Sequence, residues 1–399
     1  MGRLTAREWV SALSLVALSA TAMAVSWNTA FAQDYQRIPI AYVSQIVERP
    51  PNLSNLELPP GDEGIRGGQV AIDDNNTTGR FLKQDFSLKV VSVPPNGDAR
   101  AALEAILKEG VQFVIVNLPA AVLLEMADAT RDSDVVLLNA GAADDRLRDA
   151  DCRRNVLHIA PSRAMLTDGL AQYLMWKRWR DWLLIVGRRE GDRLFAAALR
   201  NSATKFGAKI VAERTWEFGP DARRPAQAEV HVFTQGEYDM VMVADEVGEF
   251  GEYLAYRTWL PRPVAGTQGL IPTSWHRTHE QWGAAQLQSR FLKAAGRQMT
   301  PLDYHVWLSV RAIDEAATRT RSTAFGAIKS YMLGQSFDLA GFKGQKLTFR
   351  GWDQQLRQPI LLAAPTALVS VSPQQGYLHP RSPLDTLGVD EPESRCKLN

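Results

Sequence analysis

The chain has very little cysteine: its 399 residues include only Cys152 and Cys396. An oxidising compartment would permit a disulfide between them, but the sequence alone does not show that they meet. Two unpaired thiols therefore remain the alternative.

An excess of charge of one sign is also missing. Lysine and arginine number 45 against 44 aspartate and glutamate residues, so the formal net charge is +1. A chain with balanced charge and no basic run has no electrostatic reason to seek nucleic acid. We expect no nucleic-acid partner.

The motifs of several enzyme classes are absent as well. The sequence contains no G-x-S-x-G elbow, no H-E-x-x-H pair, no G-x-x-x-x-G-K loop and no G-x-G-x-x-G after its first strand. The six histidines are scattered, without partners that the sequence links to them. We therefore expect a protein that is not an enzyme and that holds no cofactor.

One long apolar run opens the chain. Arg3 and Arg7 precede the almost wholly apolar or small stretch 10–25, and Ala30-Phe31-Ala32 has the small-x-small pattern of a cleavage site. This layout predicts a secretory signal peptide over residues 1–32. The run is shorter than the roughly 18–20 residues of a spanning helix, which disfavours the alternative of a retained anchor. The residue directly after the site is not a cysteine, so we expect a soluble, unlipidated protein in the periplasm.

Beyond residue 32, short apolar runs alternate with amphipathic segments. This alternation is typical of parallel β-α-β units, whose right-handed crossovers place helices on both faces of a sheet. The strands and helices predicted in a first cycle are 37–44, 64–76, 87–93, 98–109, 113–116, 120–129 and 135–138. Those predicted in a second cycle are 164–179, 182–186, 193–206, 209–216, 238–243 and 248–257.

Two such cycles predict an α/β protein with two doubly wound, Rossmann-like lobes. Residues 278–333 then look helical and 336–363 look like strands, so the chain is expected to return to each lobe in turn. Crossings near Ala160, 269–274 and 334–336 would form a three-strand hinge. The predicted division is 33–160 with 275–334 for lobe one, 161–274 with 335–375 for lobe two, and 376–399 for a C-terminal tail.

Four segments of this pattern are familiar. They are GIRGGQVAIDDNN at 64–76, KEGVQFVIVN at 108–117, VVLLNA at 135–140 and APSRAMLTDGLAQYL at 160–174. Together they resemble the leucine/isoleucine/valine-binding family, which has a type I periplasmic binding fold. The resemblance implies a monomeric solute-binding component of an ABC transporter, which closes about its hinge on a small ligand. Its partners would be a permease and an ATPase at the inner membrane.

A fifth segment points to a branch of that family. FRGWDQQLRQP at 349–359 is similar to binding proteins that accompany alcohol oxidation dependent on pyrroloquinoline quinone (PQQ). Trp352 and Asp353 within it are expected to brace the hinge, with a position at the edge of the binding cleft as the alternative.

The ligand is expected at the carboxyl ends of the strands. In open α/β sheets, ligands bind there because loops and helix N-termini leave unpaired N–H groups. The candidate ligand-binding residues are Ser44, Gln45, Asn117, Asn139, Ala140, Asp144, Arg188, Asp245, Glu246 and Gln268.

The loops after the third and fourth strands depart from the family pattern. Amino-acid binders of this family usually hold the ligand carboxylate with a Ser and a Thr there. Here the loops read NLPAA at 117–121 and NAGAADD at 139–145, without a hydroxyl and with two acids. The resemblance therefore carries over the fold but not the amino-acid specificity.

Four acids raise a metal hypothesis. Asp144, Asp145, Asp245 and Glu246 could converge across the cleft and supply oxygen ligands to calcium or a lanthanide, which quinone-dependent alcohol dehydrogenases require. The alternative is that Asp144 and Asp145 cap a turn and that Asp245 caps the following helix. A metal-scavenging binder is thus an alternative function.

Three further features carry weaker expectations. His276 and His279 are three residues apart, but no third metal ligand lies nearby, so chance spacing is favoured. The loop 48–60, rich in Pro and Asn, could cover the cleft or dock a partner. A sensory or accessory protein that signals to a membrane partner is therefore a second alternative.

Overall fold

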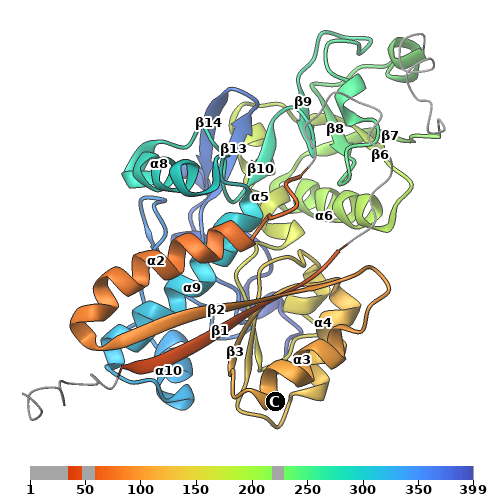
Figure 1. Cartoon of the computed structure of the whole chain (residues 1–399). Coiled ribbons are helices and arrows are strands. Elements are labelled where there is room, and N and C mark those ends of the chain that lie inside the picture. The colour runs from red at the N-terminus through yellow and green to blue at the C-terminus, as the bar shows by residue number, and fades with distance from the viewer. Residues whose placement is uncertain (1–34, 47–58, 218–228, 399) are drawn as a thin grey trace, which may run out of the picture. The chain divides into compact units, whose positions relative to one another are not determined.

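Two β-sheets organise the computed structural model, which describes residues 35–46, 59–217 and 229–398 (Figure 1). The predicted signal peptide and nearly all of the segment 48–60 lie outside the described residues. Within the described residues, no helix is both long enough and apolar enough to cross a membrane.

The first sheet has the strand order β2-β1-β3-β4-β5. Its pairs β1–β3, β3–β4 and β4–β5 are parallel. The strands are β1 (Gln36–Gln45), β2 (Gln84–Val93), β3 (Phe113–Asn117), β4 (Val136–Asn139) and β5 (Val156–His158). The helices that pack on it are α2 (Ile65–Leu82), α3 (Ala99–Lys108), α4 (Ala120–Ala129), α8 (Ala284–Ala295), α9 (Pro301–Thr320) and α10 (Phe325–Met332). We call this sheet with its helices lobe one.

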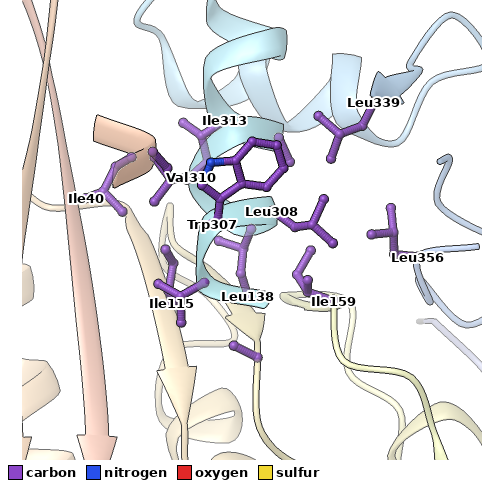
Figure 2. Packing of buried hydrophobic residues seen from close by; sticks show 14 of the residues in the cluster. Ile40, Ile115, Leu138, Ile159, Trp307, Leu308, Val310, Ile313, Leu339 and Leu356 are labelled. Carbon is purple, nitrogen blue, oxygen red and sulfur yellow. The ribbon is translucent and has the colours of Figure 1, made fainter. Parts of the chain in front are cut away.

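Alternate residues of each strand in lobe one enter two different cores, as the period of two in a strand requires. Ile40 and Tyr42 of β1 join the cluster formed with α2, α8, α9 and α10, whereas Ala41 and Val43 join the cluster formed with α3 and α4. Figure 2 shows Trp307 of α9 among the side chains of the first cluster. The central strands are therefore buried on both faces, which is why they read as continuous apolar runs.

The second sheet has the order β7-β6-β8-β9, and all of its pairs are parallel. Its strands are β6 (Asp181–Val186), β7 (Lys209–Thr215), β8 (Met240–Ala244) and β9 (Val264–Gly266). Helices α5 (Arg163–Trp176) and α6 (Glu190–Phe206) cover one face. We call this sheet with its two helices lobe two. The predicted α/β fold with parallel sheets is confirmed.

A small antiparallel sheet, β10-β13-β14, stands beside lobe two. It contains β10 (Ile271–Thr273), β13 (Ile360–Ala364) and β14 (Ala367–Ser372), and Ile360 and Leu362 pack into the same core as α5 and α6. A separate two-stranded ladder joins β11 (Leu339–Ala340) to β12 (Lys346–Leu347).

Two expectations differ from the structure. The segment 248–257 was expected to be an α-helix, but it forms only a short 3₁₀ turn, Gly251–Tyr253. Gly248 and Tyr256 have positive φ angles of 74° and 64°, which a helix does not allow. The third crossing also lies later than 334–336, because Phe337, Leu347 and Leu356 still pack in the core of lobe one and Ile360 is the first residue in that of lobe two.

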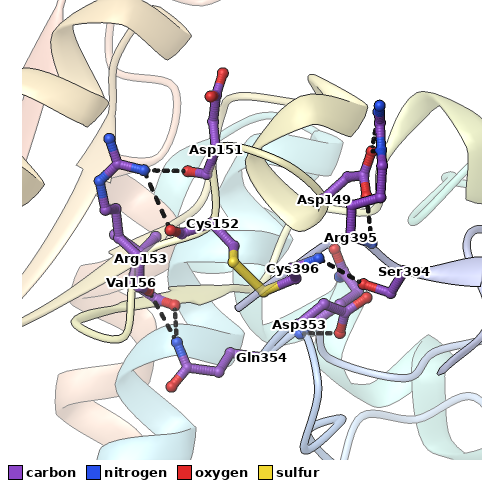
Figure 3. Close-up of a disulfide and its surroundings, with 11 residues drawn as sticks. Asp149, Asp151, Cys152, Arg153, Val156, Asp353, Gln354, Ser394, Arg395 and Cys396 are labelled. Atoms are coloured by element: carbon purple, nitrogen blue, oxygen red, sulfur yellow. Dashed lines mark hydrogen bonds and ion pairs between the residues drawn. A yellow bond between two sulfur atoms is a disulfide. The ribbon is translucent and has the colours of Figure 1, made fainter. Parts of the chain in front are cut away.

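The C-terminal segment after β14, residues 374–396, contacts both lobes. Leu384 and Leu387 are buried, and Leu387 belongs to the core of lobe two. At its end, Cys396 forms a disulfide with Cys152, which precedes β5 in lobe one, and Arg395 pairs with Asp149 beside it (Figure 3). The sequence left open whether Cys152 and Cys396 are bonded, and in the structure they are. We call residues 374–396 the C-terminal strap.

Candidate functional site

The predicted site residues lie at the carboxyl ends of the parallel strands in both lobes. In lobe one, Ser44 and Gln45 end β1, Asn117 ends β3, and Asn139 ends β4 just before Ala140. In lobe two, Arg188 follows β6, Asp245 and Glu246 follow β8, and Gln268 follows β9. Asp144 lies in the loop after β4.

Asn139 is fully buried and shapes the loop after β4. Its amide nitrogen donates to Ala142 O at 2.8 Å and lies 3.1 Å from Nδ1 of His158. Its oxygen accepts the backbone N–H groups of Gly141 and Ala142. An amide has two donor and two acceptor positions, so none is left for a ligand.

Asn117 and Ser44 are half-buried polar side chains beside the buried Tyr42. Burial raises the pKa of Tyr42, and hydrogen bonds with Asn117 and Ser44 oppose the rise. Gly141 permits this arrangement, because a Cβ there would lie 2.0 Å from Oδ1 of Asn117. The sequence analysis did not identify Tyr42 as a neighbour of Asn117 and Ser44, because a tyrosine within a strand is normally interpreted as a core residue.

Three further predicted residues, Gln45, Arg188 and Gln268, differ in their exposure and in their hydrogen bonds to the rest of the protein. The Gln45 amide donates to Pro95 O and Gly97 O, which anchors the turn after β2. Arg188 is exposed, although its guanidinium donates to the carbonyls of Trp216 and Glu217. Gln268 is half-buried and lies against Gly251.

Asp245 caps the loop that follows it. Its carboxylate accepts the backbone N–H groups of Glu249, Phe250 and Gly251 at 2.7 to 2.9 Å, and the residue is 1% exposed. A carboxylate that satisfies three amides in this way stabilises a tight turn.

Arg163 joins the acidic residues of the two lobes. Its guanidinium donates to both oxygens of Glu246 at 2.7 Å and to Oδ2 of Asp144 at 3.0 Å. Burial lowers the pKa of Arg163, but the bonds and charges of Glu246 and Asp144 outweigh it and raise the pKa overall. Sequence analysis missed Arg163, because its two acidic partners lie far from it in the sequence.

The four acids of the metal hypothesis therefore do not converge. Asp144 and Glu246 pair with Arg163, Asp245 binds three backbone amides, and Asp145 accepts the N–H of Ala164 at 2.9 Å. Among the described residues, no group of three or more His, Cys, Asp and Glu side chains could hold a metal ion. His276 and His279 instead lie beside Thr278 Oγ1 and Phe342 O.

Glutamines at 354, 355 and 358 connect the first and third crossings. Gln354 donates to Val156 O at 2.6 Å, Gln355 to His158 O and Ala160 O at 3.1 Å, and Gln358 to Ile159 O at 2.7 Å. All three are at most 4% exposed. The segment 349–359 thus has a structural role between the crossings.

Arg148 and Asp353 strengthen the same connection. Arg148, 2% exposed, donates to Ala142 O, Ala160 O and Oε1 of Gln355 at 2.8 to 2.9 Å. Asp353 accepts the N–H of Gln355 at 3.0 Å, and the Trp352 ring lies between the guanidinium groups of Arg350 and Arg357. Trp352 and Asp353 thus contact residues of the segment 350–357, and their role in bracing the hinge stays a prediction.

Two surface hollows lie away from the strand ends. One, of about 630 Å³, is lined by residues of 277–281, Gln298 and the turn 366–368. The other, of about 480 Å³, lies between 348–357 and the strap residues 379–392. Neither is lined by a predicted ligand-binding residue.

Comparison with known proteins agrees with this architecture. Residues 71–233 match the family model described as periplasmic binding protein. No curated protein matches the chain in sequence.

Solved structures match nearly the whole chain. A branched-chain amino acid ABC transporter periplasmic ligand-binding protein from Burkholderia xenovorans matches with a TM-score of 0.68 and 16% identity over 90% of this chain and 99% of that one. The leucine-, isoleucine-, valine-, threonine- and alanine-binding protein of Brucella ovis, in its closed conformation, gives 0.69 and 13% over 91% and 99%. A solute-binding protein of an ABC transporter from R. palustris, in complex with benzoate, gives 0.64 and 14% over 91% and 100%.

These proteins are binding proteins rather than enzymes, which agrees with the prediction that this chain is not an enzyme. The identities are too low to transfer a ligand, and they establish the fold alone. The chain therefore has the type I periplasmic binding protein fold, and its residues 71–233 carry the sequence pattern of the periplasmic binding protein family.

Proposed function

We propose that this chain is the periplasmic solute-binding component of an ABC-type uptake system. A small ligand binds between lobe one and lobe two, at the carboxyl ends of the strands, and the lobes close on it about the three crossings. The observation that supports this most directly is the Asp144–Arg163–Glu246 contact, which brings the strand ends of the two sheets together. The proposed partners are a permease and an ATPase at the inner membrane, and the protein acts as a monomer.

The proposed lobes follow the core clusters. Lobe one comprises 33–160 with 275 to about 357, and lobe two comprises 161–274 with the residues from about 358 to 375. The later third crossing rests on Leu356 and Ile360, which pack in different cores. The strap covers most of the predicted tail 376–399, and its disulfide adds a connection that the sequence left open.

The proposed ligand contacts are Ser44, Asn117, Arg188 and Gln268. Each of these side chains keeps exposed surface at a strand end. Ala140 is buried, and its backbone N–H and C=O already bond Val116 O and His305. Gln45, Asn139 and Asp245 instead hold the loops in place through the hydrogen bonds described above.

A narrower proposal links the ligand to PQQ-dependent alcohol oxidation. It rests only on the resemblance of residues 349–359, whose side chains are used between the crossings. It predicts that alcohols, their aldehydes and acids, or PQQ itself will bind.

A thermal-shift screen of the purified protein tests the proposed function. The ligand sets are branched-chain amino acids, aromatic carboxylates, short and aromatic alcohols with their aldehydes, and PQQ. A ligand at 100 times its Kd stabilises by about 2.7 kcal/mol, which raises the Tm of a chain of this size by about 3–5 °C. The shift should shrink in Asn117→Leu, which removes a proposed contact, and persist in Gln281→Leu, an exposed site far from the strand ends.

A hit in one set that depends on Asn117 supports the proposal and names the ligand class. Silence in all sets, from a sample with a cooperative unfolding transition, counts against solute uptake and favours the sensory or accessory alternative.

A further inference from the structure

At the strand ends, a cation of the protein itself, Arg163, pairs with the acidic side chains. Asp144 and Glu246 are the acids of the two lobes that meet there, and their side chains are 19% and 27% exposed. Arg163 lies between them with 10% of its side chain exposed and binds both. Its Nε and one terminal nitrogen bond the two oxygens of Glu246, so that carboxylate is held in a two-point pair.

The local structure fixes Arg163 in that position. It is the first residue of α5, its backbone N–H donates to Ala143 O at 2.9 Å, and Ser162 caps the helix by accepting the N–H of Met165. Glu246 is held from the other side, since its N–H donates to Asp192 at 2.8 Å and a Cβ at Gly191 would lie 2.3 Å from its Oε2. The ion pair is therefore a built feature of the two helix starts rather than a contact between mobile surface side chains.

This arrangement acts on a ligand according to its charge. An ammonium group that approached Asp144 or Glu246 would meet the guanidinium within a few ångströms, so repulsion offsets the attraction of the acids. To reach a carboxylate oxygen directly, the ammonium would have to displace a charge-assisted bond. An uncharged polar group has no such competitor, whereas a ligand carboxylate would meet Asp144 and Glu246, two acids that share the single guanidinium of Arg163.

We infer that Arg163 is a specificity-determining residue, which occupies the cationic position of the site and makes it select ligands that lack an ammonium group. This inference rests on the proposed function, because it concerns the ligand of the same site. Uncharged molecules are the ligand class that it favours, and free amino acids and amines are those that it disfavours.

Matched probes that differ only in charged groups test the inference. Hydrocinnamamide, hydrocinnamate, L-phenylalanine and phenethylamine form one set, and isocaproamide, isocaproate, L-leucine and isoamylamine form another. The Kd of each is measured by calorimetry on the purified protein. In the wild type, each uncharged amide should bind at least tenfold more tightly than the amino acid or amine of its set.

Two variants should move this preference in opposite directions. Arg163→Gln frees both acids, so the amines should gain at least tenfold relative to the acids. Glu246→Gln leaves the guanidinium with one partner, so the acids should gain relative to the amines. The matched control is Arg189→Gln, which breaks the more exposed pair with Glu249 at 2.5 Å and should leave the ratio unchanged.

The inference is overturned if a folded Arg163→Gln protein gains no affinity for amines, or if the wild type prefers the amino acids. That second result would still uphold solute binding. Failure of the wild type to bind any probe, or any compound of the thermal-shift screen, would instead count against the proposed function. If Arg163→Gln nevertheless gained affinity for the amines, that gain would still support Arg163 as the cation of the site.

Discussion

The disulfide between Cys152 and Cys396 should contribute measurably to stability. It joins the strap to lobe one across a sequence separation of 244 residues. Closing a loop of that length removes about 5 kcal/mol of chain entropy from the unfolded state, although measured contributions are more often about 2–4 kcal/mol. The entropy of unfolding is roughly 2.1 cal/mol/K per residue for a chain of 399 residues, so loss of the disulfide should lower the Tm by about 2–5 °C.

The assay compares thermal unfolding with and without dithiothreitol. The oxidised wild type should show no free thiol in denaturant, and reduction should lower its Tm by that amount. The double variant Cys152→Ser with Cys396→Ser should unfold near the reduced wild type and should not respond to the reductant. Two free thiols in the untreated protein, or an equal Tm in both states, would refute the account of the strap.

Three further predictions concern buried groups. Burial lowers the pKa of His305 to about 3 from the usual 6.5, so the unfolded chain takes up a proton that the folded chain refuses. His305 should therefore make stability fall as the pH falls from 6.5 toward 3, by about 2 kcal/mol between pH 6.5 and 5. Burial also lowers the pKa of His158, so urea unfolding of His305→Gln should lose about 2 kcal/mol of the pH dependence and keep the rest, whereas the exposed His231→Gln should keep all of it. Gln355→Leu removes the partner of Arg148 Nε and one hydrogen bond from each of the carbonyls of His158 and Ala160, which should lower the unfolding free energy by about 3 kcal/mol in urea; a loss below about 1 kcal/mol would contradict the role of the glutamines. Gly141→Ala places a Cβ 2.0 Å from Oδ1 of Asn117, so calorimetry should show at least tenfold weaker binding of whichever ligand the screen identifies.

Much of the fold could be predicted from the sequence because the strands are buried on both faces. β1, β3 and α4 lie within two residues of their predicted positions, since apolar runs and helical spacing mark them directly. The segment 248–257 failed because the positive φ angles of Gly248 and Tyr256 interrupt its helical pattern. Periodicity does not reveal the backbone angles of single residues.

The candidate site could be predicted only in part. Topology indicates which residues follow the strands, but it does not indicate which of them the protein already uses. Asn139 and Asp245 look like free polar groups in the sequence and are saturated in the structure. Arg163 was missed because its partners lie 19 and 83 residues away, and such a pair has no local signature.

The later third crossing and the strap also depend on distant contacts. Gln354, Gln355 and Gln358 reach carbonyls about 200 residues earlier in the chain. Their spacing resembles any polar loop until the two segments are seen side by side. For the same reason, the pairing of Cys152 with Cys396 could only be left open.

The central claim is that a small ligand closes lobe one and lobe two on each other. Spin labels on Glu125→Cys in α4 and Ala197→Cys in α6 report the distance between the lobes, and the two native cysteines are bonded to each other. Pulsed electron resonance should show a shorter and narrower distance distribution once a ligand from the screen is added, and no change in the Asn117→Leu variant. A ligand that binds tightly while the distance distribution stays the same would contradict binding by hinge closure.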